Sequence, residues 1–571
     1  MLELKKRLSG AIKGVLDAMN PEHGLTEEDV VSFFEYPPDT KLGDLAFPCF
    51  KLSKVMRRAP AAIAAELKDR LSLDCIDKIE PAGGYLNFFI SDAYLSRDVL
   101  GRVLEMKENY GSSDVGKGKT VVFDYSSPNV AKPFHIGHLG TTVIGHSLKK
   151  LHEFAGYRCV GINHLGDWGT QFGKMIVAFK RWGDRQLIEE KGIDELVALY
   201  VRFHAEAEKD ESLNDEARAE FTKLEHGDVE DRALWKWFIE ISIAEYKKTY
   251  RQLDIEFDSY CGESFYYDKL PAVIDELKAK GLLKLDEGAS VVDLGEYGMP
   301  PCLILKSDGS SLYPARDIAA AIYRKKTYDF DKCVYVTDAG QHLHFMQFFK
   351  VLELMGYDWA KGLVHVPYGK VSINGAKLAT RTGNVILLKD LFAQAIDKVE
   401  KIMDEKNPDL PDKHEKAVEV GVGAVVFYYL TNNRIKDINF VLEDALNFDG
   451  NTGPYAQYTY ARTCSLLEKG AEYLKGEVGD YTPNEREREV LKALAVFPER
   501  VLGALEEYEP SVITRYILDL CAAYNVFYHD CKILTAESED ARAFRMRLSQ
   551  ATSFALGNAF GLICMKKTQK I

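Results

Sequence analysis

The sequence predicts an α/β protein built around a Rossmann-like parallel sheet, with an α+β domain before the sheet and an all-α helical bundle after it. Three observations predict this fold class. From Lys119 onward, short apolar strands alternate with helices, which is typical of βαβ units. A mixed helix and strand pattern precedes that region. In the last third of the chain, apolar residues recur only at helical spacing.

Changes of pattern predict the domain organisation, and the 571 residues suffice for three or four domains. We expect an N-terminal domain at residues 1–112, a Rossmann-like catalytic domain at 113–400 and a helical domain at 401–571. A charged helical stretch at about 176–260 interrupts the second domain and indicates an insertion. Glycine and serine residues around Gly111 are typical of a linker out of the first domain.

The first domain begins with an amphipathic helix. A second helix is expected at 61–71, directly after Pro60, and a strand at 84–90. The second domain is expected to contain strands at 120–125, 157–163, 333–336 and 363–368, with helices at 139–155 and 341–355 that each end before a glycine. Beyond about Lys413 no strand is expected, and helices are predicted at 417–430, 456–474, 485–505, 512–527 and 541–562.

Composition argues against several classes of protein. The net charge of −14 argues against a protein that coats nucleic acid in general. A local basic surface is still compatible with this net charge. Ten cysteines without a Cys-x-x-Cys pair indicate neither a zinc site nor a disulfide framework, so no metal site is expected. No apolar run is long enough to predict a signal peptide or a membrane span, and we expect a cytoplasmic protein.

The tetrapeptide His135-Ile136-Gly137-His138 lies where a strand leads into a helix. In a doubly wound sheet, ligands bind beyond the carboxyl ends of the strands, beside the free NH groups of helix N-termini. Gly137 allows a nucleotide to approach the backbone, and two imidazoles three residues apart can direct donors at one phosphate. Taken alone, the tetrapeptide is equally compatible with two histidines that cap a helix.

The surrounding segment 124–138 closely resembles arginyl-tRNA synthetases, which are class I aminoacyl-tRNA synthetases. Segments 163–173, 313–317 and 448–455 resemble the same family, and the resemblance covers essentially the whole chain. It implies an arginine–tRNA ligase, which uses ATP to convert L-arginine to arginyl-adenylate and then transfers arginine to the terminal adenosine of tRNA(Arg). It also implies Mg²⁺, no tightly bound cofactor, and activation that requires tRNA. We expect a monomer without membrane contact.

The resemblance further implies that substrate arginine contacts Asp124, Asn129, Tyr313, Asp317 and Gln341. A guanidinium is planar, permanently charged and rich in donors, so two carboxylates with amide and phenol oxygens form a cage that lysine does not satisfy. Without the resemblance, Asp124 and Asp317 are interpreted as ordinary acids at a strand end and a helix start. Asn129 is then interpreted as the first residue of an Asx-turn.

The second class I signature, normally Lys-Met-Ser-Lys-Ser, corresponds to Lys377-Leu378-Ala379-Thr380-Arg381, in which the second lysine is Thr380. We expect Lys377, assisted by Arg381, to stabilise the phosphates together with His135 and His138. ATP is then bound by His135, Gly137, His138 and Lys377. The alternative interpretation is a basic surface turn.

Two positions depart from the family pattern. Gly140 stands where the family usually has arginine, and His146 stands where it usually has Asp or Asn. Glycine in a first helical turn costs about 1 kcal/mol of helix propensity, and its presence removes a cation from beside the triphosphate. These departures keep two alternatives open, which are a catalytically impaired RNA-binding paralogue and a nucleotidyltransferase of the same superfold. The nucleotidyltransferase would leave the helical C-terminal domain unexplained.

In the helical C-terminal domain, Tyr455, Tyr458 and Tyr460 are candidates for stacking on unpaired anticodon bases, with Arg462 near phosphates. The alternative is that these tyrosines form an ordinary helical core. By the same resemblance, the N-terminal domain contacts the outer corner of the tRNA.

Overall fold

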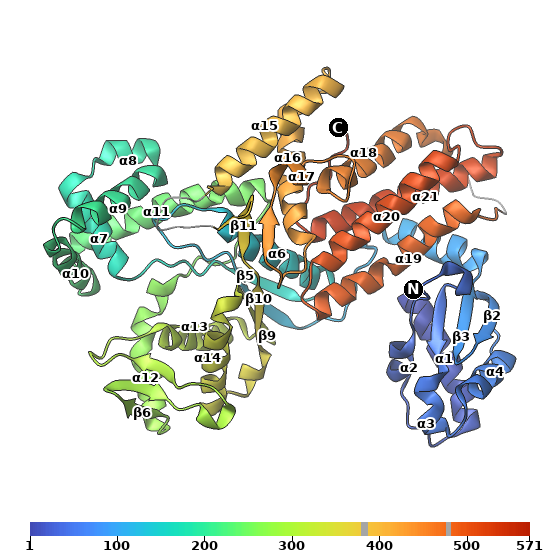
Figure 1. Ribbon diagram of the computed structural model, residues 1–571, viewed down its shortest axis with the longest axis horizontal. Coiled ribbons are helices and arrows are strands. Elements are labelled where there is room, and N and C mark those ends of the chain that lie inside the picture. The colour runs from blue at the N-terminus through green and yellow to red at the C-terminus, as the bar shows by residue number, and fades with distance from the viewer. Residues whose placement is uncertain (378–385, 475–480) are drawn as a thin grey trace.

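The computed structural model describes residues 1–377, 386–474 and 481–571, and the predicted fold class is confirmed (Figure 1). A parallel sheet lies at the centre. The C-terminal helices lie on one side of it, next to the N-terminal unit, and a lobe of helices lies on the opposite side.

The N-terminal unit is a three-stranded antiparallel sheet, in the order β1-β3-β2, covered by helices. The predicted helix and strand correspond to α4 and β3, whereas β1 and β2 were not predicted. All four residues of β1 are buried, so its sequence shows no alternation. The elements are α1 (Leu2–Met19), α2 (Glu27–Phe33), β1 (Leu45–Pro48), α3 (Ser53–Met56), α4 (Pro60–Arg70), β2 (Ile76–Ala82), β3 (Tyr85–Ile90) and α5 (Leu100–Met106).

The central sheet has four parallel strands in the order β10-β9-β4-β5. Each predicted strand and helix is present with small shifts at its ends. Asp124, the last residue of β4, pairs with Ile162 of β5 and Tyr335 of β9, so loops from three strands meet at one edge. The elements are β4 (Thr120–Asp124), α6 (Leu139–Phe154), β5 (Arg158–Ile162), α13 (Tyr313–Tyr328), β9 (Lys332–Asp338), α14 (His342–Leu354) and β10 (Leu363–Tyr368).

Two additions separate the halves of this sheet. The first is a helical lobe in the region where the sequence indicates a helical insertion. The second is a three-stranded antiparallel meander that the sequence did not predict, because its strands have only four residues each. The elements are α7 (Thr170–Trp182), α8 (Arg185–Lys191), α9 (Ile193–Ala207), α10 (Ser212–Glu225), α11 (Val229–Gln252), α12 (Leu270–Ala279), β6 (Leu283–Asp286), β7 (Ala289–Val292) and β8 (Cys302–Leu305).

The five helices predicted for the C-terminal bundle are present, but the expectation of no strand beyond Lys413 is wrong. The short strand β13 returns to pair in parallel with β11, and three residues are too few to produce a recognisable pattern. The elements are β11 (Val371–Ile373), β12 (Ala376–Lys377), α15 (Leu388–Lys406), α16 (Lys413–Leu430), β13 (Ile438–Phe440), α17 (Leu442–Ala445), α18 (Gly453–Lys469), α19 (Glu485–Glu506), α20 (Ser511–Asp530) and α21 (Glu539–Leu562).

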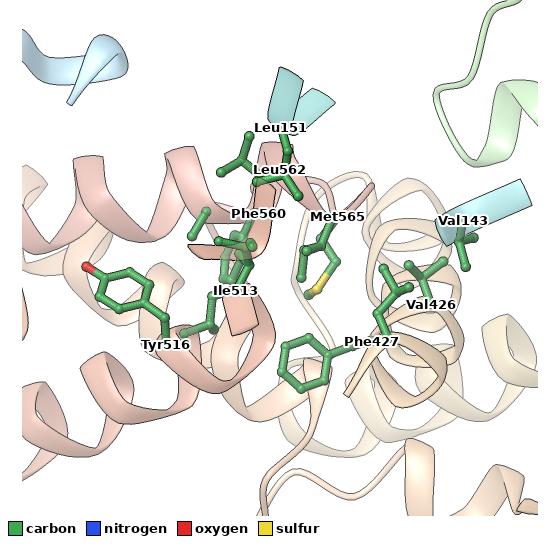
Figure 2. Packing of buried hydrophobic residues seen from close by; sticks show 14 of the residues in the cluster. Val143, Leu151, Val426, Phe427, Ile513, Tyr516, Phe560, Leu562 and Met565 are labelled. Carbon is green, nitrogen blue, oxygen red and sulfur yellow. The ribbon is translucent and has the colours of Figure 1, made fainter. Parts of the chain in front are cut away.

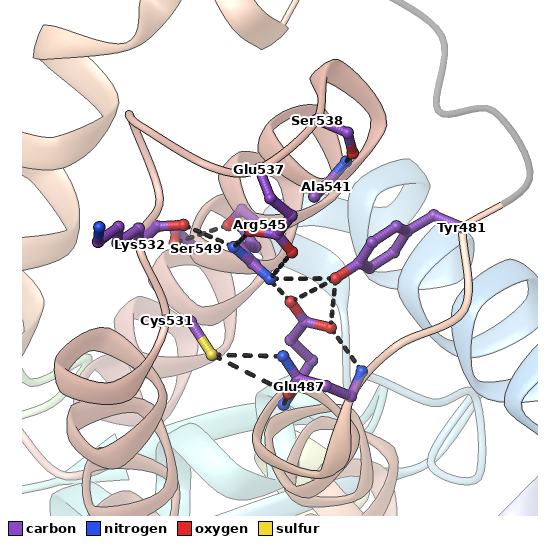
Figure 3. Close-up of polar contacts among 10 residues, drawn as sticks. Tyr481, Glu487, Cys531, Lys532, Glu537, Ser538, Ala541, Arg545 and Ser549 are labelled. Carbon is purple, nitrogen blue, oxygen red and sulfur yellow. Dashed lines mark hydrogen bonds and ion pairs between the residues drawn. The ribbon is translucent and has the colours of Figure 1, made fainter.

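A buried ion pair joins α19 to α21 within the bundle (Figure 3). Arg545 donates from Nε to Glu487 Oε1 at 2.5 Å, and the side chains are 4% and 0% exposed. The hydroxyl of Tyr481 donates to the same carboxylate at 2.9 Å. These contacts satisfy two charges that would otherwise be costly to bury.

Among the described helices, none is long and apolar enough to cross a membrane.

Helix α6 joins the central sheet to the bundle. Val143 and Leu151 of α6 pack into the same apolar cluster as Phe427 of α16 and Leu562 of α21 (Figure 2). The hydroxyl of Ser147 donates to the carbonyl oxygen of Leu562 at 2.6 Å. The middle of α6 is therefore held by residues from the far end of the chain.

The packing of α6 explains Gly140. A Cβ atom at this position would lie 2.2 Å from the hydroxyl oxygen of Tyr429 and 3.2 Å from Cε2 of Tyr368. Both tyrosine rings crowd this position, and Tyr429 is only 2% exposed. The tyrosines of α16 and β10 therefore leave no room for a side chain at this position.

Replacing Gly140 tests this close packing. We expect Gly140→Arg to lower the free energy of unfolding by about 3 kcal/mol or more, because it overpacks the contact and buries a charge. Thermal unfolding followed by circular dichroism measures the loss. The control is Gly14→Arg in α1, where a Cβ meets no atom within 4 Å. Equal melting temperatures for Gly140→Arg and the unsubstituted protein would contradict the packing argument.

Candidate active site and RNA-binding surface

The two histidines of His135-Ile136-Gly137-His138 are held as neutral donors just before α6. The backbone NH of Gly137 donates to Nδ1 of His135 at 3.0 Å, and the NH of His135 donates to Nδ1 of His138 at 3.2 Å. Burial lowers the pKa of His135 to about 4 and that of His138 to about 3. A neutral imidazole that accepts at Nδ1 carries its proton on Nε2. Each ring therefore has one fixed NH group available for a ligand.

Lys132 lies in the same loop, three residues before His135. Burial lowers the pKa of its ammonium group. Within the part of the chain that the structure describes, this ammonium has no acidic or hydrogen-bonding partner, although desolvated cations are normally paired. The sequence analysis did not single out Lys132. No Asp or Glu occurs between Tyr125 and His152, and this absence could have indicated that Lys132 has no acidic partner nearby in the sequence.

The loop at 377–381 is only partly described. The backbone of Lys377 lies in β12, opposite Ser372 of β11, but its side chain and the whole of Arg381 lie outside the described residues. Ile386 and Leu387, where the described chain resumes, lie beside the histidine loop. The NH of Ile136 donates to the carbonyl oxygen of Ile386 at 3.2 Å, and His135 forms an isolated bridge with Leu387. Backbone contacts therefore join the histidine loop to the segment that resumes at Ile386.

Both acids proposed for the arginine cage already have a basic partner. Asp124 Oδ2 accepts from Arg324 of α13 at 2.7 Å, and Asp124 Oδ1 accepts from the hydroxyl of Ser127 at 3.0 Å. Asp317 Oδ2 lies 2.6 Å from Nε2 of His344 on α14. Neither partner was predicted, because each lies on a different element from the acid that it contacts.

Three further residues complete the predicted arginine set. Asn129 follows β4, and its carbonyl oxygen accepts from the hydroxyl of Tyr246 at 2.7 Å. Tyr313 begins α13 one turn before Asp317 and is 64% exposed. Gln341 is exposed and directly precedes α14. These residues come from loops and helices that follow or flank adjacent strands β4 and β9.

His146, the second departure from the family pattern, lies inside the core. Its Nδ1 is 3.0 Å from the hydroxyl oxygen of Tyr125, and its side chain is 3% exposed. Burial lowers its pKa to about 3. This residue therefore contributes a neutral hydrogen bond within the core.

An exposed aromatic and basic surface lies on α18 and α20. Arg462 lies over the rings of Tyr458 and Tyr528, at 5.1 and 4.9 Å from their centroids. Tyr458 is 47% exposed and Tyr528 is 39% exposed, so both rings reach solvent. Tyr455 is half-buried and accepts from Asn525 at 3.0 Å. Sequence reasoning did not single out Tyr528.

Tyr460, in contrast, is a core residue, as the alternative interpretation expected. It is 9% exposed, and its ring centroid lies 5.7 Å from that of Phe560. The predicted stacking role for Tyr460 is therefore wrong, because its ring faces the interior of the bundle.

Comparison with known proteins is in agreement with this arrangement. The family model "tRNA synthetases class I (R), catalytic domain" matches residues 100–442. Models of the arginyl-tRNA synthetase N-terminal domain and the DALR anticodon-binding domain match residues 2–90 and 456–571.

Full-length relatives show the same likeness. The chain is 50% identical over 574 residues to the arginine–tRNA ligase of Clostridioides difficile (strain 630), with 100% of both chains covered. It is 49% identical over 550 residues to that of Alkaliphilus metalliredigens (strain QYMF), covering 96% of this chain and 97% of the relative. The structure of Thermus thermophilus arginyl-tRNA synthetase superposes with a TM-score of 0.84 at 26% identity and covers both chains completely. The chain therefore belongs to the arginyl-tRNA synthetase family of class I aminoacyl-tRNA synthetases.

Proposed function

We propose that the chain is an arginine–tRNA ligase in which the residues described above hold ATP and arginine for a two-step reaction. In the first step, the carboxylate of arginine attacks the α-phosphorus of ATP, which forms arginyl-adenylate and releases pyrophosphate. In the second step, a ribose hydroxyl of the terminal adenosine of tRNA(Arg) attacks the acyl carbon and releases AMP. No side chain needs to act as a nucleophile, so the rate depends on positioning and charge stabilisation.

The observation that carries this proposal is the pair of fixed Nε2–H donors on His135 and His138. Because both rings are neutral, they contribute hydrogen bonds and little positive charge. We assign the charge to Lys132 and Lys377, with Arg381 assisting. Gly137 leaves the backbone open to the nucleotide.

ATP is a substrate of class I synthetases, and we propose that Mg²⁺ enters with it. Among the described residues, no group of three His, Cys, Asp or Glu side chains is arranged to hold a metal. The triphosphate itself supplies oxygen ligands of the kind that Mg²⁺ prefers. The ion is therefore part of the magnesium–ATP substrate.

For the arginine substrate, we propose that Asp124, Asn129, Tyr313, Asp317 and Gln341 form the pocket. Asp317 keeps Oδ1 without a partner among the described residues, which leaves one carboxylate oxygen for the guanidinium. The surface of Tyr458, Arg462 and Tyr528, with Tyr455 beside it, is proposed to hold anticodon bases, since it lies in the region that matches an anticodon-binding model. We propose that the enzyme acts as a monomer in the cytoplasm, where tRNA and ATP are available.

ATP–pyrophosphate exchange with arginine and tRNA tests the proposal. Exchange that depends on arginine supports it. Binding of tRNA without exchange would instead identify a catalytically impaired RNA-binding paralogue, and exchange with another small substrate would identify a nucleotidyltransferase.

Removing the charge of Asp317 tests the arginine pocket. We expect Asp317→Asn to raise the KM for arginine by roughly 100-fold, because it removes the acid that faces the guanidinium. The KM for ATP should remain close to that of the unsubstituted enzyme. The control is Asp329→Asn at the opposite end of the same helix, where the acid pairs with Lys325 at the surface. An unchanged KM for arginine in Asp317→Asn would refute the assignment.

Replacing Lys132 tests the source of positive charge. We expect Lys132→Met to lower kcat/KM for ATP by about 100-fold, because the cation stabilises phosphate charge in the transition state. Lys174→Met is the matched control, since burial also lowers the pKa of Lys174, whose ammonium lies over the ring of Phe203 in the helical lobe. If both variants retain the original kcat/KM, Lys132 has no role at the phosphates.

Removing one exposed ring tests the RNA-binding surface. We expect Tyr528→Ala to weaken binding of tRNA by about 10-fold, because a stacking face is lost. Filter binding or fluorescence anisotropy measures the affinity. Tyr297→Ala is the control, because Tyr297 is a similarly exposed ring beneath Lys350, outside the bundle. Equal affinity for tRNA in the Tyr528 variant and the unsubstituted protein would contradict the assignment.

A further inference from the structure

Three acids each have one basic partner: Asp124 at the end of β4, Glu263 beside the loop that follows β5, and Asp317 on α13. Asp124 pairs with Arg324 at 2.7 Å, and Glu263 pairs with Arg316 at 2.9 Å. The third acid, Asp317, pairs with His344 at 2.6 Å. A guanidinium keeps its charge at every pH at which the protein is folded, whereas histidine changes its charge between about pH 5 and 8 in ordinary surroundings.

This difference singles out Asp317. The negative charges of Asp124 and Glu263 are permanently compensated, but that of Asp317 is compensated only while His344 is protonated. With a neutral His344, the negative charge of Asp317 is uncompensated and can attract the positive charge of an arginine side chain. With a protonated His344, that charge is cancelled. The imidazole and the carboxylate are 26% and 25% exposed, so both solvent protons and a substrate can reach them.

The geometry also orients the carboxylate. Nε2 of His344 contacts only Oδ2 of Asp317, which leaves Oδ1 for another donor. Phe345 and Phe348 contact the imidazole at centroid distances of 5.4 and 5.5 Å and limit its movement. A hydrogen bond from a held ring to one carboxylate oxygen determines the direction of the other oxygen.

We propose that His344 is a positioning residue that controls the affinity for arginine, because it orients Asp317 when neutral and cancels its charge when protonated. The inference rests on the proposed role of Asp317 in binding the guanidinium. It predicts that arginine binding weakens as the pH falls, while the guanidinium of the substrate stays charged.

Other titratable groups around this pair allow the effect to be isolated. His365 on β10 lies near His344, and burial lowers its pKa to about 4, partly through the charge of His342. Burial raises the pKa of the Cys302 thiol on β8 to about 12, with a smaller contribution from Asp317. Neither group changes its charge between about pH 6 and 8. His342 on α14 contacts His365 at 3.0 Å and has no contact with Asp317, so it provides a matched histidine.

The experiment measures the KM for arginine in ATP–pyrophosphate exchange, with the full-length enzyme and saturating tRNA, between about pH 6 and about pH 8. We expect the KM of the unsubstituted enzyme to be about fivefold higher at the acidic end, with a much smaller change in the KM for ATP. His344→Gln retains a hydrogen-bond donor without titrating, so its KM should be nearly independent of pH. His344→Leu should raise the KM at both ends of the range. His342→Gln should retain the original pH dependence.

Each outcome separates this inference from the function on which it rests. If Asp317→Asn leaves the KM for arginine unchanged, the role of Asp317 fails, and this inference fails with it. If Asp317→Asn raises the KM but His344→Gln retains the full pH dependence, only the role of His344 is overturned. A normal KM for ATP in the His344 variants shows that they are folded. A pH dependence that disappears in His342→Gln as well as in His344→Gln would overturn the assignment to His344.

Discussion

The close packing of helix α6 against the end of β4 on one side and the C-terminal bundle on the other determines where His135 and His138 lie. A Cβ at Gly145 would lie 2.3 Å from Cβ of Tyr125, and one at Gly140 would lie 2.2 Å from the hydroxyl of Tyr429. The two glycines therefore let the helix backbone approach the side chains of Tyr125 and Tyr429 closely. Since His138 directly precedes α6, displacement of the helix would move both imidazoles away from the proposed phosphate site.

This packing also gives a structural reason for the departure from the family pattern at Gly140. The Tyr429 ring leaves no room for a cation on the helix there, whereas Lys132 in the preceding loop is partly buried and has no acidic partner among the described residues. In the proposed site, the neutral imidazoles supply directed hydrogen bonds to the triphosphate, and the lysines supply positive charge. Such a division suits a loop in which burial disfavours protonated histidine.

Pairing between acidic and basic side chains determines the charge of the proposed arginine pocket. Buried carboxylates are costly unless they are paired, and each of the three acids near the arginine pocket has a basic partner. Complete compensation would remove the attraction for a cationic substrate. The pairing of Asp317 with an imidazole in place of a guanidinium leaves the negative charge of this acid for the proposed ligand whenever the imidazole is neutral.

The amino-acid sequence alone predicts the fold class, the strands and helices of the central sheet, the five helices of the bundle and the histidine loop. Each of these follows from a periodicity or a motif within one continuous segment. The strands β1 and β13 escaped prediction because they are too short, or too uniformly buried, to show a pattern. Only the tertiary structure showed that Tyr429 covers Gly140, that Arg324 neutralises Asp124 and that His344 contacts Asp317. These contacts join residues on different elements, up to 289 positions apart for Gly140 and Tyr429. Local sequence does not encode such distances, because they arise when separate elements pack together.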